Sequence, residues 1–375
     1  MTMLTAIGLM SGTSYDGVDV ALINTDGERI GRLGPTGYRP YSTPEREVLR
    51  HAIAAAANLS SPDERPRALC AAEELVTDMH AEAVEAFLAA NGLPQSSVAV
   101  VGFHGQTVLH RPDRRISIQL GNGEALAARV GIPVVYGFRA ADIASGGQGA
   151  PMVPIFHRAM VSLLRRPHPV AVLNLGGVAN LTFISGDALV AFDTGPGNAL
   201  IDDFLRLRTG HPQDEHGALA AAGSVDEAAL TRLLAHPFFA KPGPKSLDRN
   251  AFRHWVAEEG GFAGKSTEDG AATITALTAA AVALASKHLP QRPQSWIAAG
   301  GGTRNDTLMR MLRERLAPAR VDTAADVGWS ADALEAQAFG FLAVRTLKGL
   351  PITFPSTTGA PRPLPGGILA RRPNL

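Results

Sequence analysis

The hydrophobic positions of this chain fall into short apolar runs that alternate with longer segments of helical spacing. Apolar runs at 4–10 and 18–24 flank a polar turn and predict two paired strands. Strands that alternate with helices along a chain indicate an α/β fold with mixed sheets. Further strands are expected at 97–103, 116–120, 134–136, 171–184 (a hairpin), 189–193 and 295–299, and helices at 44–57, 64–91, 124–130, 198–208, 225–235, 267–288, 305–316 and 331–348.

Two of the expected strand pairs are joined by glycine-rich turns of the same design. The first is AIGLMSGTSYDGVDVALI, at 6–23, where three glycines permit sharp bends and close approach of a ligand. Successive backbone N–H groups in such a turn can bind an anion, and Asp16 or Asp19 could hold a hydrated Mg²⁺ against phosphates. An ordinary solvated turn is the alternative. The second turn, at 171–184, lies about one domain length later, so two related halves are expected.

Length and charge agree with a two-domain enzyme. A chain of 375 residues predicts two domains, at 1–167 and 168–348, with 349–375 completing the first. Lys+Arg and Asp+Glu both number 35, which predicts neither a nucleic-acid nor a membrane partner. The single cysteine, Cys70, excludes an internal disulfide, fits a reducing compartment and is expected to be buried. Without a visible signal segment, a cytoplasmic location is expected.

Two polar clusters follow expected strands in the first half, where ligands of open α/β sheets bind. In one, His104 and Gln106 could donate to a sugar hydroxyl or a carboxylate. In the other, the planar guanidinium of Arg139 suits a carboxylate, and the following loop contains three glycines between 146 and 149. The alternatives are a polar turn and a structural pair between Arg139 and Asp142.

Two similar clusters follow strands in the second half. Asp193 ends an apolar strand, where partial desolvation would raise its pKa and make it a better base. Asn198 begins the next helix as a ligand or as a simple N-cap. The three glycines at 300–302 would let a flat ring or a phosphate lie on the backbone, and Asn305 would cap the helix that follows.

The sequence lacks the motifs of several enzyme classes. The chain has no GxxxxGK[ST] sequence, which disfavours a P-loop NTPase, and no GxSxG sequence of an α/β-hydrolase. It also has no His/Cys spacing typical of a zinc site.

The motifs together resemble the anhydro-N-acetylmuramic acid kinase family. They occur in one order along 6–360: GLMSGTSYDGVDVALI, GFHGQTVLHRP, IQLGNGEALAARVGIPVVYGFRAADIASGGQGAPMVPIFH, VLNLGGVANLTFI, FDTGPGNALID, GPKSLDRNAF and GGGTRNDTLM. The resemblance implies a two-domain actin-like ATPase fold, of the ribonuclease H-like type, with an active site in the cleft between the domains. It also implies ATP and Mg²⁺ as cofactors, a homodimer, and a role in peptidoglycan recycling.

The implied reaction opens a ring and transfers a phosphoryl group. Water attacks C1 of 1,6-anhydro-N-acetylmuramic acid while O6 takes the γ-phosphoryl group of ATP, giving N-acetylmuramic acid 6-phosphate and ADP. The catalytic residues that the resemblance implies are Asp193, as the base for water, and Glu335, which faces the sugar. Asp16 and Asp19 are the expected metal ligands, directly or through water. The expected ATP-binding residues are Gly12, Thr13, Ser14, Tyr15, Asp16, Gly17, Val18, Asp19, Gly176, Gly177, Asn180, Gly300, Gly301 and Gly302. The expected sugar-binding residues are His104, Gln106, Arg139, Asp142, Gln148, Gly195 and Asn198.

Two other functions stay open at this point. An ordinary hexose or amino-sugar kinase would use Asp193 to deprotonate a free hydroxyl. A nucleotide-switch module of the actin or chaperone type would have no sugar substrate, but such proteins carry insertions for which this chain has little spare length. Tyr15 departs from the family pattern, which usually has leucine there, and its ring could narrow the mouth of the phosphate loop.

Overall fold

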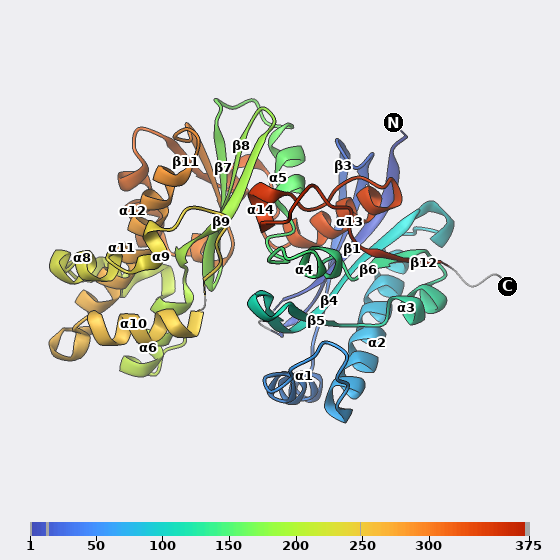
Figure 1. The fold of residues 1–375 in the computed structure, drawn as a ribbon, viewed down its shortest axis with the longest axis horizontal. Helices are drawn as coiled ribbons and strands as arrows, with labels where there is room; N and C mark the ends of the chain where they lie inside the picture. Colours follow the sequence, from blue (N-terminus) through green and yellow to red (C-terminus); the bar gives the residue numbers. More distant parts are fainter. Residues whose placement is uncertain (1, 13–14, 248, 372–375) are drawn as a thin grey trace. The chain divides into compact units, whose positions relative to one another are not determined.

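The computed structural model describes residues 2–12, 15–247 and 249–371, with the backbone alone for 249–251. The chain divides into two compact units (Figure 1). Unit 1 comprises Met1–Leu163 and Asp332–Leu375, and unit 2 comprises Leu164–Ala331. Each unit is built on one mixed sheet.

The sheet of unit 1 has the strand order β3-β2-β1-β4-β6-β12, with β5 paired to the second half of β4. The first three strands form an antiparallel meander, β4 is parallel to β1, and β6 is parallel to β4. The C-terminal strand β12 pairs antiparallel with β6, so the end of the chain completes this sheet. In the described residues the strands are β1 (Leu4–Ser11), β2 (Gly17–Thr25), β3 (Ile30–Pro40), β4 (Val100–Arg111), β5 (Ile116–Leu120), β6 (Val134–Tyr136) and β12 (Ile368–Ala370).

The long helix α13 (Leu334–Leu347) packs directly on β1, β2 and β4 because glycines remove the side chains between them. A Cβ on Gly8 would overlap the carbonyl group of Ala336, and one on Gly102 would overlap that of Phe339. Helix α13 is buried along most of its length. The domain boundaries expected from the sequence assigned this helix to the second domain, whereas the structure places it in unit 1, whose sheet covers its apolar surface.

The other face of this sheet is covered by α1 and α2, which share a core with Ile7 and Leu9 of β1. Cys70 of α2 is exposed, so the expectation that it is buried was wrong: it lies on the outer side of an amphipathic helix. The helices of unit 1 in the described residues are α1 (Thr43–Ala56), α2 (Arg67–Ala90), α3 (Gly123–Val130), α4 (Ala140–Ala144), α5 (Pro154–Val161), α13 and α14 (Pro355–Thr358), with short 3-10 turns at Gln95–Ser97 and Pro112–Arg114.

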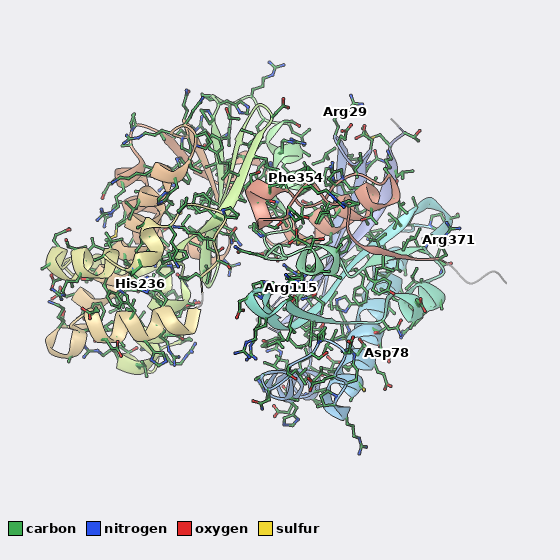
Figure 2. The ribbon with its side chains drawn as sticks, in the orientation of Figure 1. Arg29, Asp78, Arg115, His236, Phe354 and Arg371 are labelled. Carbon is green, nitrogen blue, oxygen red and sulfur yellow. The ribbon has the colours of Figure 1, made fainter. Side chains whose placement is uncertain are left out.

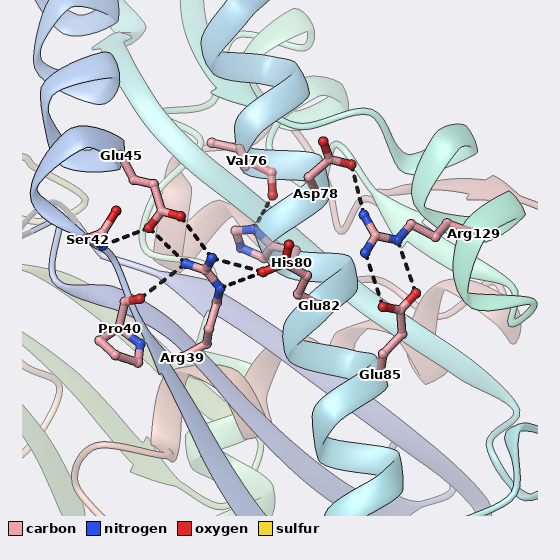
Figure 3. A network of polar contacts seen from close by, with 10 residues as sticks. All are labelled: Arg39, Pro40, Ser42, Glu45, Val76, Asp78, His80, Glu82, Glu85 and Arg129. Carbon is pink, nitrogen blue, oxygen red and sulfur yellow. Dashed lines mark hydrogen bonds and ion pairs between the residues drawn. The ribbon is translucent and has the colours of Figure 1, made fainter.

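Two arginines connect α2 to its neighbours (Figure 3). Arg39 of β3 pairs with one carboxylate of α1 and with Glu82 of α2, each at 2.9 Å. Arg129 of α3 pairs with Asp78 and Glu85 of α2 at 2.9 and 3.0 Å. Because several of these side chains are partly exposed, the pairs contribute orientation more than stability.

The sheet of unit 2 repeats the plan of unit 1. Its order is β9-β8-β7-β10-β11, again an antiparallel meander followed by two strands parallel to the first. The repetition agrees with the two related halves that the glycine turns predicted, and the two-domain α/β fold class is confirmed. The described strands are β7 (Val170–Leu175), β8 (Val178–Ser185), β9 (Ala188–Pro196), β10 (Ser295–Ala299) and β11 (Arg320–Thr323).

Helix α11 (Thr267–Ala285) forms the centre of the helical layer of unit 2. With the 3-10 turn that follows, Thr267–His288 is long and apolar enough to cross a membrane, but 78% of its most apolar window is buried inside the structure. It is therefore a core helix, as the sequence predicts. The other helices described in unit 2 are α6 (Ala199–Thr209), α7 (Ala218–Ala222), α8 (Glu227–Leu234), α9 (Pro237–Ala240), α10 (Arg249–Glu259) and α12 (Asp306–Leu316), with 3-10 turns at Glu215–Gly217, Phe262–Gly264, Ser286–His288, Gly301–Arg304 and Ala325–Val327.

Candidate active site

The glycine turn of unit 1 joins β1 to β2. Two of its expected phosphate-binding residues, Thr13 and Ser14, lie outside the described residues. Tyr15 adopts a left-handed backbone conformation (φ 55°), and its N–H donates to the carbonyl of Gly12 at 3.3 Å. The buried Gln106 donates from Nε2 to the same carbonyl at 3.1 Å. Gln106 therefore holds the backbone of Gly12, and its contact with a sugar stays a prediction.

Three carboxylates of unit 1 raise the pKa of a fourth, Asp19, beside this turn. Asp19 faces Met10 across the hairpin, and its pKa is raised to about 7, first by desolvation and then by the charges of Asp16, Asp332 and Glu335. Asp332 was missed by sequence reasoning, because it becomes significant only when α13 packs on β1. A cation would relieve this repulsion, and Mg²⁺ binds through one or two carboxylates and waters. In the described part of the chain, no three His, Cys, Asp or Glu side chains are grouped as direct ligands of a metal ion.

Arg139 is held by His104. Its Nε and Nη2 atoms donate to His104 Nε2 at 3.2 and 3.0 Å, and its Nη1 donates to the carbonyl of Gly149 at 2.6 Å. His104 Nδ1 lies 2.7 Å from the carbonyl of Gly105, which requires a proton on Nδ1. Burial and the Arg139 charge lower the pKa of His104 well below its usual value, so the ring is neutral and Nε2 accepts.

These contacts give His104 a structural role. Both ring nitrogens are engaged by protein groups, so His104 orients the guanidinium, and its contact with a sugar stays a prediction. Burial lowers the pKa of Arg139 to about 10, against an opposing effect of Glu335, so Arg139 stays charged at neutral pH. Its five N–H groups exceed the contacts described, which leaves donors for a ligand.

Asp142 organises the glycine-rich loop that follows α4. Its Oδ2 accepts from the N–H of Gly149 at 2.7 Å, and its Oδ1 accepts from the hydroxyl of Thr358 at 2.6 Å. The N–H of Gln148 donates to the carbonyl of Thr358 at 2.7 Å. Asp142 is 1% exposed and holds the loop to the C-terminal segment. Its charge also raises the pKa of Arg139, in line with the alternative of a structural pair, and its contact with a sugar stays a prediction.

Glu335 lies in the first turn of α13. Its side chain is accessible to solvent, yet enough protein surrounds the carboxylate for burial to raise its pKa, with the Arg139 charge acting in the opposite direction.

Asp193 lies on β9 in unit 2, opposite Asn180 of β8. Its Oδ2 accepts from the N–H of Leu247 at 2.8 Å, and its own N–H donates to the carbonyl of Lys245 at 3.0 Å. Desolvation raises the pKa of Asp193 to about 6, although the Leu247 hydrogen bond and the Lys245 charge lower it. This is the partly desolvated carboxylate that the sequence predicts. The loop that clamps it was missed as a functional element, although its GPKS sequence stood out among the motifs.

Four glycines expected at the ATP site, Gly176, Gly177, Gly301 and Gly302, line a cavity of about 310 Å³ in unit 2. Asn198 is not a side-chain N-cap: its Nδ2 donates to both carboxylate oxygens of Asp202 at 2.9 Å. Asn305 is the expected cap, since its Oδ1 accepts from the N–H of Leu308. Gly195 is buried in β9 against Ala281 of α11 and does not line the cavity. The lining residues are Leu175, Gly176, Gly177, Asn198, Ala199, Asp202, Gln213, Asp214, His216, Gly301, Gly302, Arg304 and Asn305.

The cavity of unit 2 has glycine walls, two carboxylates, and three side-chain amides from Asn198, Gln213 and Asn305. A ligand-sized cavity of this kind suits a polar ligand with flat and hydroxylated parts. Asp202 and Asp214 were not expected there. Asp202 could have been found as the residue one helical turn after Asn198.

Comparisons with known proteins agree with the family that the motifs resemble. The family model described as anhydro-N-acetylmuramic acid kinase matches residues 4–370. A protein of that name from Rhodopseudomonas palustris is 60% identical over 370 residues, which covers 98% of this chain and 100% of the relative. One from Nitrobacter winogradskyi is 55% identical over 370 residues, with the same coverage. Among solved structures, (R)-2-hydroxyglutaryl-CoA dehydratase component A from Acidaminococcus fermentans has a TM-score of 0.49 at 11% identity, over 92% of this chain and 99% of that one.

Proposed function

The chain belongs to the anhydro-N-acetylmuramic acid kinase family, and from this premise we propose that it opens 1,6-anhydro-N-acetylmuramic acid with water and phosphorylates O6 with ATP. The bond from C1 to O6 breaks, the water oxygen joins C1, and O6 takes the γ-phosphoryl group. The products are N-acetylmuramic acid 6-phosphate and ADP, and one proton of the water passes to a base. The role is in cell-wall recycling, and we propose a cytoplasmic homodimer.

Asp193 is the base, and its held, desolvated carboxylate is the observation that carries the mechanism. With a pKa of about 6, it is ionised at neutral pH yet more basic than an exposed aspartate. The Leu247 N–H occupies one face of Oδ2, which fixes the direction in which the carboxylate can accept a proton. The base acts on water because O6 of this substrate is not a free hydroxyl.

Arg139 recognises the carboxylate of the lactyl group, which most sugars lack. A guanidinium pairs with a carboxylate through two parallel N–H donors, so its orientation matters. His104 and the Gly149 carbonyl fix that orientation before substrate arrives. Glu335 faces the sugar. Its charge and that of Arg139 each favour the ionised form of the other residue.

The nucleotide is bound by the glycine turns. The cavity beside Gly176 and Gly302 accommodates the nucleoside part of ATP, with the hydrogen-bonded pair of Asn198 and Asp202 in the wall beside its hydroxyls. The turn that begins at Gly12 binds phosphates through backbone N–H groups. Asp16 and Asp19 would hold Mg²⁺, directly or through water, and bound Mg²⁺ would neutralise charge on the phosphates.

The test is ADP release by purified protein with MgATP, with and without 1,6-anhydro-N-acetylmuramic acid. We expect release to depend on this sugar, and ¹⁸O from labelled water to appear at C1 of the 6-phosphorylated product. N-acetylglucosamine serves as the control acceptor, because its free hydroxyl suits an ordinary amino-sugar kinase. Asp193→Asn should bind ADP normally and lose turnover. Sugar-independent release, or full turnover in this variant, would contradict the mechanism.

A further inference from the structure

Lys245 is a buried lysine beside the proposed base. Its side chain is 7% exposed, which is rare for lysine. The ammonium lies 4.4 Å from the ring centre of Phe238 and 5.6 Å from that of Phe192. Nζ donates to the carbonyl of Phe238 at 2.9 Å. The rings of Phe192 and Phe238 and one carbonyl therefore hold the Lys245 ammonium in a fixed position next to β9.

The backbone around Lys245 is tied to Asp193 on both sides. The carbonyl of Lys245 accepts from the N–H of Asp193, and the N–H of Leu247, two residues later, donates to the carboxylate. Gly243 lies so close to β9 that a Cβ there would overlap the ring of Phe192. The segment 243–247 therefore packs against β9 and is hydrogen-bonded to the proposed base, Asp193.

The two charges act on each other. The Lys245 ammonium lowers the pKa of Asp193. Desolvation lowers the pKa of Lys245 to about 8, although the Asp193 charge acts in the opposite direction. Lys245 is thus charged across the range near pH 6 in which Asp193 titrates. Other ionisable groups on the elements around it include Lys241, His236 at the start of α9 (labelled in Figure 2), His288 after α11, and Arg253, His254, Glu258 and Glu259 of α10.

We propose that Lys245 is a positioning residue for the reaction: its caged ammonium is a fixed positive charge near the Asp193 carboxylate, its carbonyl holds the backbone N–H of Asp193, and the N–H of Leu247 in the same segment holds the carboxylate. Lys245 does this without touching substrate, since its side chain is enclosed by Phe192 and Phe238. The proposal rests on the proposed function, in which Asp193 is the base.

The first experiment is the pH profile of kcat/KM for Lys245→Met. Loss of the ammonium favours the protonated form of Asp193, so the acid limb should move up by about one pH unit. At pH 6 the value of kcat/KM should fall about fivefold more than at pH 8. Lys241→Met removes an exposed lysine two residues before the segment 243–247 and should leave the acid limb unmoved. An equal loss at every pH would show a merely structural residue and overturn the proposal.

A second measurement avoids any variant of Lys245, in case Lys245→Met does not fold. The sequence contains five lysines, so ¹³Cε-lysine NMR gives few signals, and Lys245 is assigned by replacing the other four singly. Its pKa should be near 8 and should fall further in Asp193→Asn, because the stabilising negative charge is gone. An unchanged pKa in that variant, or an ordinary lysine pKa in the wild type, overturns the proposal.

The two experiments separate this inference from the function on which it rests. If Asp193→Asn retains turnover, the proposed base is wrong while the NMR coupling can still be present. If Asp193→Asn is inactive and the acid limb of Lys245→Met is unmoved, the proposed function stands and the inference fails.

Discussion

Gly8→Ala should destabilise unit 1 by obstructing the contact between β1 and α13. The new Cβ would overlap the carbonyl of Ala336 and lie 2.5 Å from the backbone nitrogen of Gly340. Both obstacles are backbone atoms of a buried helix, so no side chain can rotate away. Overpacking of a core costs about 1–3 kcal/mol, and we expect the upper end, about 3 kcal/mol.

The expected change in melting temperature follows from the size of unit 1. An entropy of unfolding of about 2.1 cal/mol/K per residue over roughly 200 residues gives a decrease of about 7 °C. Because Glu335 adjoins Ala336, a displaced helix also moves that carboxylate, so sugar-dependent turnover should fall in folded protein.

The assay is thermal unfolding by circular dichroism, with activity measured well below the transition. Gly264→Ala is the matched control: nothing lies within 4 Å of its added Cβ, and its backbone is not left-handed. It should be neutral or slightly stabilising. Equal melting temperatures for Gly8→Ala and Gly264→Ala would refute the idea that glycine is required for this contact.

Three further predictions concern chemistry. Arg139→Ala should raise the KM for the anhydro sugar about 10- to 100-fold and leave ADP affinity unchanged in calorimetry, because a charge-assisted pair contributes about 1.5–3 kcal/mol; equal loss of both would exclude its role in sugar recognition. In the wild type, kcat/KM should fall tenfold per pH unit below about pH 6, since protonated Asp193 cannot accept a proton; a flat profile down to pH 5 would remove Asp193 as the base. Binding of MgATP at pH 7 should release protons, because a cation lowers the raised pKa of Asp19; calorimetry in two buffers of different ionisation enthalpy measures the release, which Asp19→Asn should abolish.

Much of the fold could be predicted from the periodicity of apolar residues. The paired strands around the first glycine turn and the helices α2 and α11 have strong patterns, and they formed close to the expected bounds. Strand β3 was missed because IGRLGPTGYRP contains three glycines and two prolines and is exposed along much of its length. Such a strand exists only because β2 offers it hydrogen-bond partners.

The candidate site was predicted in part, for a similar reason. Asp193 stood out because a carboxylate ended an apolar strand, which is a local signal. Lys245 did not, because the loop that contains it reaches Asp193 only after more than fifty residues of intervening chain. Its burial arises from Phe192 and Phe238, which the fold brings together around it.

The sequence by itself determined the α/β class, the repeated glycine turns and the residue types available for phosphoryl transfer, because these depend on local spacing and on side-chain chemistry. The tertiary structure alone decided which polar groups are already engaged. Asp142 accepts from Thr358, 216 positions away, and His104 accepts from Arg139, 35 positions away. Hydrogen bonds and desolvation depend on distance in space, and a polar residue whose partners lie far along the chain looks the same in sequence as one free to bind a ligand.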